Sequence, residues 1–365
     1  MSRLSIGIVG LPNVGKSTLF NAMTALQVAA DNYAFCTIEP NVGIVSIYDD
    51  RLEQLSQISG SDTIVQSTIK FVDIAGLVQG AADGEGLGNQ FLANIRECEA
   101  IVHVVRGFED SDVMHVHGDV DPIRDIEVIN TELLLADLEL AEKLCENQRR
   151  RTKSGQKEEQ QLLALYERLL AALQASTPIR ALSFNEKEQG MLKGLGFLTG
   201  KKVIYVVNVS EEGLSESPAC VADIQAYASK EGDEVLSVCA HLEGELSQLS
   251  ASEQLEYLTS LGVSERGLNR LAKASFRLLG YQTFLTTGEK ETRSWTIRQG
   301  DLAPQAAGAI HTDFEKGFIR ANVVSFEDFV SCKGFQGAKE QGRLRQEGSE
   351  YRMNEGDVVE FLFNV

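Results

Sequence analysis

The sequence has few cationic residues, no closely spaced pairs of cysteines and no long apolar runs. Its 365 residues include 34 lysines and arginines against 53 aspartates and glutamates, a formal net charge of −19. This balance argues against a surface that coats nucleic acid, although it permits a local basic patch. The six cysteines show no C-x-x-C spacing, so neither a zinc knuckle nor a disulfide framework is predicted.

Membrane insertion and secretion are also not expected. No run of about 18 apolar residues is present to span a bilayer, and the N-terminal residues show no signal-peptide pattern before Leu4. We therefore predict a cytoplasmic protein without a membrane partner. Its length is typical of two or three domains, and a hydrophobic content of 43% is ordinary for packed cores.

Short apolar runs alternate with longer segments along most of the chain. These runs lie at residues 4–10, 68–74, 100–105, 203–207 and 235–238. Such spacing is typical of a parallel α/β sheet with helices on both faces. After Gly280 the pattern changes to short β-rich stretches with glycine-containing turns, which predicts a small C-terminal domain over 281–365. The main domain is then expected to cover residues 1–280.

Residues 125–176 show a helical pattern instead. Apolar residues recur at steps of three and four from Ile126 to Leu144 and again from Leu162 to Leu173, which predicts two amphipathic helices. A basic connection over 149–157 contains Gly155 and separates them. We expect a helical hairpin with a positive tip, inserted into the main domain at about 125–200. One long helix with a solvated charged middle is the alternative.

The first apolar run leads into the sequence GLPNVGKS, which matches the phosphate-binding pattern G-x-x-x-x-G-K-[ST] between a strand and a helix. The glycines let the backbone wrap a phosphate, and the helix N-terminus supplies a positive field. Lys16 is expected to reach the β- and γ-phosphates and the Ser17 hydroxyl to bind Mg²⁺. The candidate phosphate-binding residues are Gly10, Asn13, Val14, Gly15, Lys16, Ser17 and Thr18.

Two further motifs narrow the class of nucleotide-binding protein. Asp73-Ile74-Ala75-Gly76 follows the second apolar run, where a carboxylate can hold Mg²⁺ through water and the Gly76 N–H can sense a γ-phosphate. Between the motifs, the Thr37 hydroxyl can complete the Mg²⁺ shell when a γ-phosphate is present. The alternative for Thr37 is a surface residue before a turn. Ser17, Thr37 and Asp73 are the candidate metal ligands.

The base-reading segment departs from that of G proteins, in which N-K-x-D reads guanine. Here the strand over 203–207 is followed by Asn208, Val209, Ser210 and Glu211. The ring-covering lysine is replaced by valine, and the carboxylate is one methylene longer. Adenine presents an acceptor at N1 and a donor at N6, so a carboxylate placed for guanine repels it, whereas a displaced one need not. Asn208 can bind the base or the phosphate loop, and main-chain groups of Val209 can read adenine. Ala240 occupies the place of the last base-contacting loop.

The catalytic position is unusual as well. Small GTPases often place glutamine directly after D-x-x-G to orient the attacking water, but Leu77 stands here. Another group must then orient the water. His115 lies in a loop after the run at 100–105 and is a candidate; a solvated loop histidine is the alternative. With Lys16 and Gly76 it completes the candidate catalytic set.

These segments together resemble the YchF / Obg-like ATPase family over essentially the whole chain. The resemblance rests on GLPNVGKSTLFNA, FCTIEPNVG, DIAGLV-x-GA-x-x-GEGLGN-x-FL, NVSE and AAGAIHTDFEKGFIRA. It implies a Ras-like P-loop NTPase domain of the Obg type, the helical hairpin insert and a C-terminal TGS domain of β-grasp fold. It also implies Mg²⁺-dependent hydrolysis of ATP in preference to GTP, adenine binding by Asn208–Glu211, and catalysis by His115. A departure is Ala34, where the family usually has proline.

The resemblance also implies association with the ribosome or ribosomal RNA, and no DNA partner is expected. The available cations are Arg149, Arg150, Arg151, Lys153 and Lys157 at the hairpin tip, and Arg320, Lys333, Lys339, Arg343, Arg345 and Arg352 in the C-terminal domain. A solvated charged face is the alternative for each cluster. Three functions stay open: an ATPase that drives or times an event, a nucleotide-gated adaptor with negligible intrinsic hydrolysis, and a GTPase.

Overall fold

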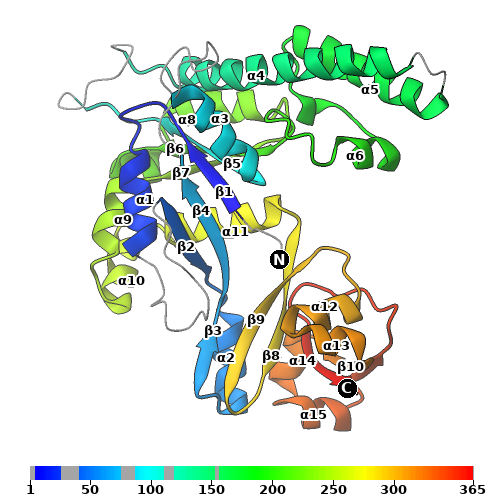
Figure 1. Cartoon of the computed structure of the whole chain (residues 1–365). Coiled ribbons are helices and arrows are strands. Elements are labelled where there is room, and N and C mark those ends of the chain that lie inside the picture. The colour runs from blue at the N-terminus through cyan, green and yellow to red at the C-terminus, as the bar shows by residue number, and fades with distance from the viewer. Residues whose placement is uncertain (1–4, 26–40, 75–86, 111–118, 153–155, 365) are drawn as a thin grey trace. The chain divides into compact units, whose positions relative to one another are not determined.

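The structure is a computed structural model that describes residues 5–25, 41–74, 87–110, 119–152 and 156–364 (Figure 1). The chain folds into two units, and each of them combines residues that are distant in sequence. One unit comprises Met1–Ile44 and Lys70–Arg270, and the other comprises Val45–Ile69 and Leu271–Val365. The sequence pattern predicts a single boundary at residue 280. The structure divides the chain differently, because residues 45–69 share a core with the C-terminal part.

The first unit is built on a mostly parallel sheet. Six strands of the described residues form it, in the order β2-β4-β1-β5-β6-β7. They are β1 (Ser5–Val9), β2 (Val42–Ile47), β4 (Ser67–Asp73), β5 (Ala100–Arg106), β6 (Lys202–Asn208) and β7 (Glu234–Val238). Every residue of β1 and β5 is buried, as expected for central strands with helices on both faces. The predicted strands are thus present, and all parallel pairs place their carboxyl ends at one edge.

Helices connect these strands and cover the sheet. Among them, α1 packs against α9, α3 against β1, and α8 against β7. Their bounds are α1 (Lys16–Ala25), α3 (Leu87–Glu97), α6 (Glu186–Leu192), α7 (Glu211–Glu216), α8 (Ala219–Ala228), α9 (Ala240–Leu246) and α10 (Ala251–Ser260), with a 3₁₀ turn at Ile179–Ala181. A further helix, α11 (Gly267–Leu278), contains the boundary between the two units. No helix among the described residues has the length and apolar character needed to cross a bilayer.

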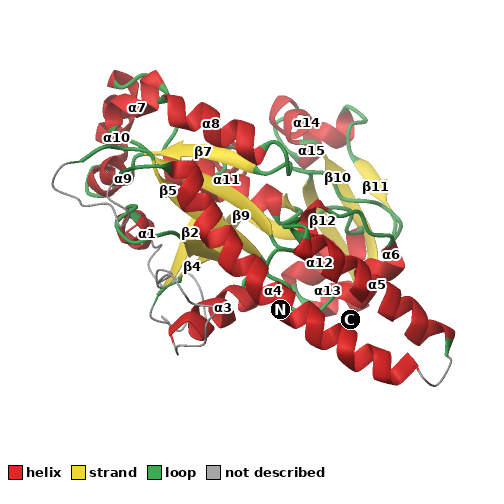
Figure 2. Cartoon of the chain, turned by 90° about the horizontal axis from the view of Figure 1, so that it is seen from above, coloured by secondary structure: helices red, strands yellow, loops and turns green. Residues whose placement is uncertain are grey.

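The predicted hairpin consists of α4 (Pro122–Arg151) and α5 (Lys157–Gln174), which run side by side in both views (Figure 2). The Asp121 carboxylate caps α4 by accepting a bond from the Arg124 N–H at 3.1 Å. Two separate helices are present, so the alternative of one long helix is wrong. The buried Asp137 carboxylate fixes the hairpin to the sheet domain, because it accepts bonds from the N–H groups of Leu198 and Thr199 at 2.8 and 2.7 Å. Burial raises the pKa of Asp137.

The second unit contains another sheet, with the order β11-β10-β12-β8-β9-β3 among the described strands. An antiparallel hairpin, β8–β9, is followed by a helix, and β12 returns to the middle of the sheet parallel to β8. This is the predicted β-grasp arrangement. The bounds are α2 (Arg51–Ser59), β3 (Thr63–Val65), β8 (Tyr281–Thr287), β9 (Glu291–Arg298), α12 (Ala303–Ile310), α13 (Thr312–Lys316), β10 (Phe318–Val324), α14 (Phe326–Ser331), α15 (Phe335–Glu340), β11 (Arg345–Glu347) and β12 (Val358–Phe363).

Candidate functional site

The loop between β1 and α1 has the backbone shape that a phosphate loop needs. Asn13 and Gly15 adopt positive φ values of 63° and 90°, the left-handed region that favours glycine. A β-carbon on Gly15 would come within 2.1 Å of the Asn208 side-chain nitrogen, so a larger residue is excluded by space as well as by conformation. The helix then begins at Lys16, and the Leu19 N–H donates to the Gly15 carbonyl at 2.9 Å.

Lys16 forms an ion pair with Asp73, which ends β4. The two side chains are 10% and 18% exposed, so both can be reached by a ligand. Ser17 and Thr18 line the same cleft from the first turn of α1, where unbonded N–H groups and the helix dipole favour an anion. The structure thus brings Lys16, Ser17, Thr18 and Asp73 together at one end of the cleft.

These residues fit Mg²⁺ by the chemistry of their donors. The Ser17 hydroxyl and the Asp73 carboxylate are hard oxygen ligands, which Mg²⁺ prefers, and Mg²⁺ usually keeps several waters beside one or two protein groups and substrate phosphates. Both residues line the cleft that contains the phosphate loop. The third candidate ligand, Thr37, lies outside the described residues, as do Gly76, Leu77 and His115.

Asn208, the first residue of the substituted base motif, connects two loops. Its side chain is buried, and its amide nitrogen donates to the Val14 carbonyl at 3.0 Å. Its amide oxygen accepts from the Ala240 N–H at 2.9 Å. Of the two predicted roles, the structure shows the bond to the phosphate loop. Asn208 therefore holds the phosphate loop against the start of α9.

The next residues line the other end of the cleft. Val209 is buried, and its N–H donates to the Val238 carbonyl at 2.9 Å, so this N–H is not available to a base. Ser210 caps α7 by accepting from the Gly213 N–H at 3.3 Å. The Glu211 carboxylate accepts a bond from the Tyr257 hydroxyl at 3.4 Å, and its negative charge raises the pKa of Tyr257.

One cleft of about 1110 Å³ is lined by Asn13, Gly15, Lys16, Ser17, Thr18, Asp73, Asn208, Val209, Ser210, Glu211 and Ala240. Three neighbouring residues that the sequence analysis missed also line it, namely Phe108, Glu109 and Asp110. Arg106 holds this segment: its Nε donates to the Phe108 carbonyl at 3.1 Å, and its guanidinium lies 4.5 Å from the centre of the Phe108 ring. Arg106, a charged residue at the end of a fully buried strand and directly before Gly107, was the available signal.

Comparison with known proteins agrees with this geometry. The family YchF-GTPase_C, described as a protein of unknown function, matches residues 281–364, and the family MMR_HSR1, described as 50S ribosome-binding GTPase, matches residues 5–140. A protein of Escherichia coli O157:H7 named ribosome-binding ATPase YchF is 52% identical over 98% of this chain and 99% of its own length. The chain belongs to the YchF family.

Other YchF proteins extend the match. The relative of the same name from Bacillus subtilis is 48% identical over 99% of this chain and all of its own length. Among solved structures, the YchF GTPase of Schizosaccharomyces pombe superposes with a TM-score of 0.89 at 35% identity, covering 99% of this chain and 98% of that one. The predicted family and the predicted fold class are confirmed. The names of these relatives differ between ATPase and GTPase, so they do not decide which base this YchF-family chain selects.

The cleft has further lining residues outside the predicted set. Cys239 lies beside Ala240 and lines the cleft, but burial raises the pKa of its thiol. A buried neutral thiol is a poor nucleophile. His241 and Glu212 line the cleft beside the base motif, and their polar side chains were not singled out from sequence because no motif marks them.

Proposed function

We propose that this chain is a Mg²⁺-dependent P-loop ATPase that prefers ATP to GTP and acts as a nucleotide-switched, ribosome-associated regulatory protein. The observation that carries this proposal is the cleft, in which a complete phosphate loop and Asp73 lie at one end and the substituted base motif at the other. YchF relatives named ribosome-binding ATPase support the same conclusion.

The phosphate end supplies binding and charge stabilisation. The Lys16 ammonium group reaches the β- and γ-phosphates, while N–H groups of Asn13–Thr18 donate to phosphate oxygens. Mg²⁺, when bound, would offset the negative charge that develops during phosphoryl transfer. Ser17, Thr37 and Asp73 would hold it. Because Lys16 and Asp73 are already paired beside the phosphate loop, little reorganisation of these two groups is needed during hydrolysis.

The base end supports adenine over guanine for two reasons. The lysine that covers the guanine ring in N-K-x-D proteins is replaced by the buried Val209, and the Glu211 carboxylate is engaged by the Tyr257 hydroxyl. A carboxylate oxygen that accepts from Tyr257 is less available to guanine N1–H and its 2-amino group. The Val209 carbonyl is the group that we assign to accept a bond from the adenine 6-amino group, since the Val209 N–H is used within the protein.

Hydrolysis needs a group that orients water, because Leu77 cannot do so. We assign this role to His115, whose imidazole can accept a proton near neutral pH. Slow intrinsic turnover is expected from Leu77, so bound ATP acts chiefly as a switch. An adaptor with negligible hydrolysis would use the same cleft.

Ribosomal RNA contact is assigned to the basic hairpin tip and to the cations of the C-terminal unit. Arg149 pairs with Glu167 at 2.9 Å, and its side chain is 58% exposed. Exposed ion pairs contribute little energy, so a phosphate can replace the glutamate. In the C-terminal unit, Arg320 bonds Gln346 at 3.4 Å and Arg343 lies 3.8 Å from Asp328. Cytoplasmic location and the absence of a DNA partner stay predictions.

The test combines ATP turnover with ribosome pelleting. Purified ribosomes are expected to bind the protein better with a Mg-bound non-hydrolysable ATP analogue than with ADP, and to raise ATP turnover. ATP-dependent binding with unchanged turnover would favour the adaptor. Ribosome binding that is the same with the ATP analogue and with ADP, together with no measurable ATP hydrolysis, would contradict the proposal.

A further inference from the structure

The segment 45–69 lies in sequence between two candidate Mg²⁺ ligands, Thr37 and Asp73, yet it folds with the C-terminal unit. It consists of the end of β2, then α2 and β3, and the start of β4. We define this stretch as the inserted segment. Its two ends continue directly into strands of the nucleotide-binding sheet, because β2 and β4 each cross the boundary between the units.

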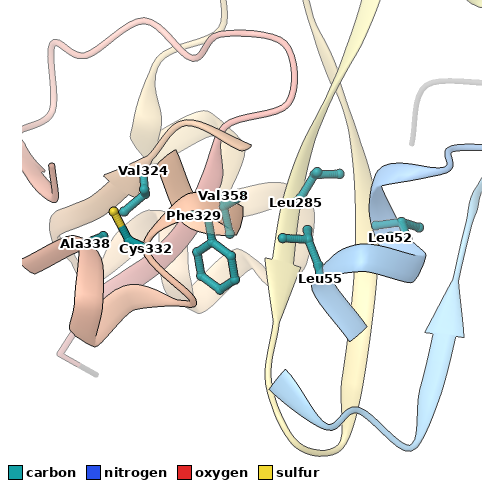
Figure 3. Packing of buried hydrophobic residues seen from close by; sticks show 8 residues of the cluster. All are labelled: Leu52, Leu55, Leu285, Val324, Phe329, Cys332, Ala338 and Val358. Carbon is teal, nitrogen blue, oxygen red and sulfur yellow. The ribbon is translucent and has the colours of Figure 1, made fainter. Parts of the chain in front are cut away.

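The apolar side of α2 is part of the C-terminal core. Leu52 and Leu55 are fully buried in a cluster with Leu285, Phe329 and Val358. Figure 3 shows the Leu55 side chain of α2 on the side that faces Phe329 and Val358 of the C-terminal region. Full burial of one leucine side chain stabilises the folded state by about 1.5–3 kcal/mol. The two leucines of α2 are therefore a substantial part of the stability of the C-terminal unit. The inserted segment is therefore an integral layer of the C-terminal unit.

The rest of the segment is held by polar contacts. β3 extends the second sheet by pairing in parallel with β9, with Ile64 opposite Thr292. The Ser61 hydroxyl donates to the Gly288 carbonyl at 2.7 Å. The Arg51 guanidinium donates to the Glu355 carboxylate at 2.6 Å. Backbone pairing and side-chain bonds thus fix the segment from several directions.

The last of these contacts is at the start of β4. The Ser67 N–H donates to the Ser294 hydroxyl oxygen at 2.7 Å, and the Ser67 hydroxyl donates to the Ser294 carbonyl at 3.1 Å. Both residues are buried. Breaking such a buried pair leaves polar groups unsatisfied, which costs about 1–3 kcal/mol. This serine pair fixes the position of β4 at its first residue.

The other end of the same strand carries Asp73, which pairs with Lys16. Six residue steps separate Ser67 from Asp73, about 20 Å of extended chain. An extended strand bonded to its neighbours transmits a displacement along its axis, because it has little freedom to buckle. The register of β4 against β1 places Ile8 opposite Asp73, so Asp73 lies beside the strand that leads into the phosphate loop.

We propose that Ser67 and Ser294 are positioning residues for the nucleotide site, and that through β4 the C-terminal unit controls the placement of Asp73. This inference rests on the proposed function of the cleft. Thermodynamic linkage makes the effect reciprocal. If the folded C-terminal unit increases the affinity for Mg-nucleotide, then bound Mg-nucleotide stabilises the C-terminal unit by the same free energy. A partner that binds the C-terminal unit therefore alters nucleotide binding without contacting the cleft.

The first experiment compares Ser294→Ala with wild-type full-length protein, and uses exposed Ser349→Ala from the same unit as the matched control. The Mg²⁺ concentration for half-maximal ATP turnover is measured. Ser294→Ala is expected to raise it by roughly three- to tenfold, and Ser349→Ala to leave it unchanged. A purely structural role would lower the amount of folded protein without shifting the Mg²⁺ requirement of the folded fraction.

The second experiment tests reciprocity in the wild-type protein by amide hydrogen exchange. A Mg-bound non-hydrolysable ATP analogue is expected to slow exchange in α2, β3 and β9. An unchanged Mg²⁺ requirement in Ser294→Ala, or unchanged exchange in a wild-type protein that binds nucleotide, would overturn the inference. If Ser294→Ala fails to fold, the exchange result decides alone. Failure of the wild-type protein to bind any nucleotide would instead contradict the proposed function.

Discussion

At the phosphate end of the cleft the charged groups face the ligand, whereas at the base end most polar groups are bonded to the protein. Lys16 and Asp73 are partly exposed and lie against the phosphate loop. By contrast, both ends of the Asn208 amide and the Val209 N–H have partners within the protein. This difference indicates that most of the nucleotide affinity comes from the phosphate end. Selection of the base then depends on the few polar groups at the base end that can still bond a ligand.

The largest expected effect comes from Lys16→Ala. Because this ammonium group serves the phosphates, which ATP and GTP share, the affinities for both Mg-bound analogues should fall by more than about a hundredfold, roughly 3 kcal/mol. The Asp73 carboxylate would also lose its partner. Calorimetric titration measures both affinities, with Lys143→Ala on the exposed side of α4 as the control. Retained Mg-ATP affinity would remove the phosphate loop from the account.

His115→Ala separates catalysis from binding at the phosphate end. Turnover should fall by about a hundredfold, the usual range for loss of a general base, while the affinity for the ATP analogue stays unchanged. Steady-state hydrolysis and calorimetry provide the two readouts. His117→Ala, two residues further along the sequence, is the matched control and should retain turnover. Equal turnover in the two variants would exclude His115 from the mechanism.

Asn208→Ala tests whether the two ends are physically connected. The variant removes the donor to Val14 and the acceptor from Ala240, so the phosphate loop loses its link to α9. We expect a loss of about 1–3 kcal/mol in the free energy of unfolding, and a roughly tenfold loss of affinity for ATP and GTP analogues alike. A loss confined to one nucleotide would mean that Asn208 reads the base instead.

The smallest expected effect is that of Glu211→Gln. If the carboxylate does not read guanine, both nucleotide affinities should change by less than about threefold. The pKa of Tyr257 should fall toward its ordinary value, because the negative charge that raises it is gone. Ultraviolet titration with Tyr257→Phe as reference measures this shift. A tenfold loss restricted to the GTP analogue would show that Glu211 still serves guanine.

Much of this site was accessible from the sequence because its motifs are local. The phosphate loop, Asp73 and the strand before Asn208 each carry their pattern within a few residues, and parallel strands bring their carboxyl ends to one edge. The two helices of the hairpin could also be predicted from the spacing of their apolar residues.

The inserted segment was not accessible in the same way. The apolar residues of α2 predict a buried face but do not say which sheet covers it, and their partners, such as Leu285 and Phe329, are more than two hundred residues away. The bonds of Asn208 also required the structure, because its motif is compatible with binding either the base or the phosphate loop. Long-range packing and the choice between partners are tertiary properties, which local patterns do not encode.

The most direct test of the account is calorimetric titration of nucleotide-free protein with Mg-bound non-hydrolysable ATP and GTP analogues under identical conditions. The account predicts tighter binding of the ATP analogue, because Val209 and Glu211 no longer form a guanine site. Tighter binding of the GTP analogue would contradict it and would make the chain a G protein with an altered base motif.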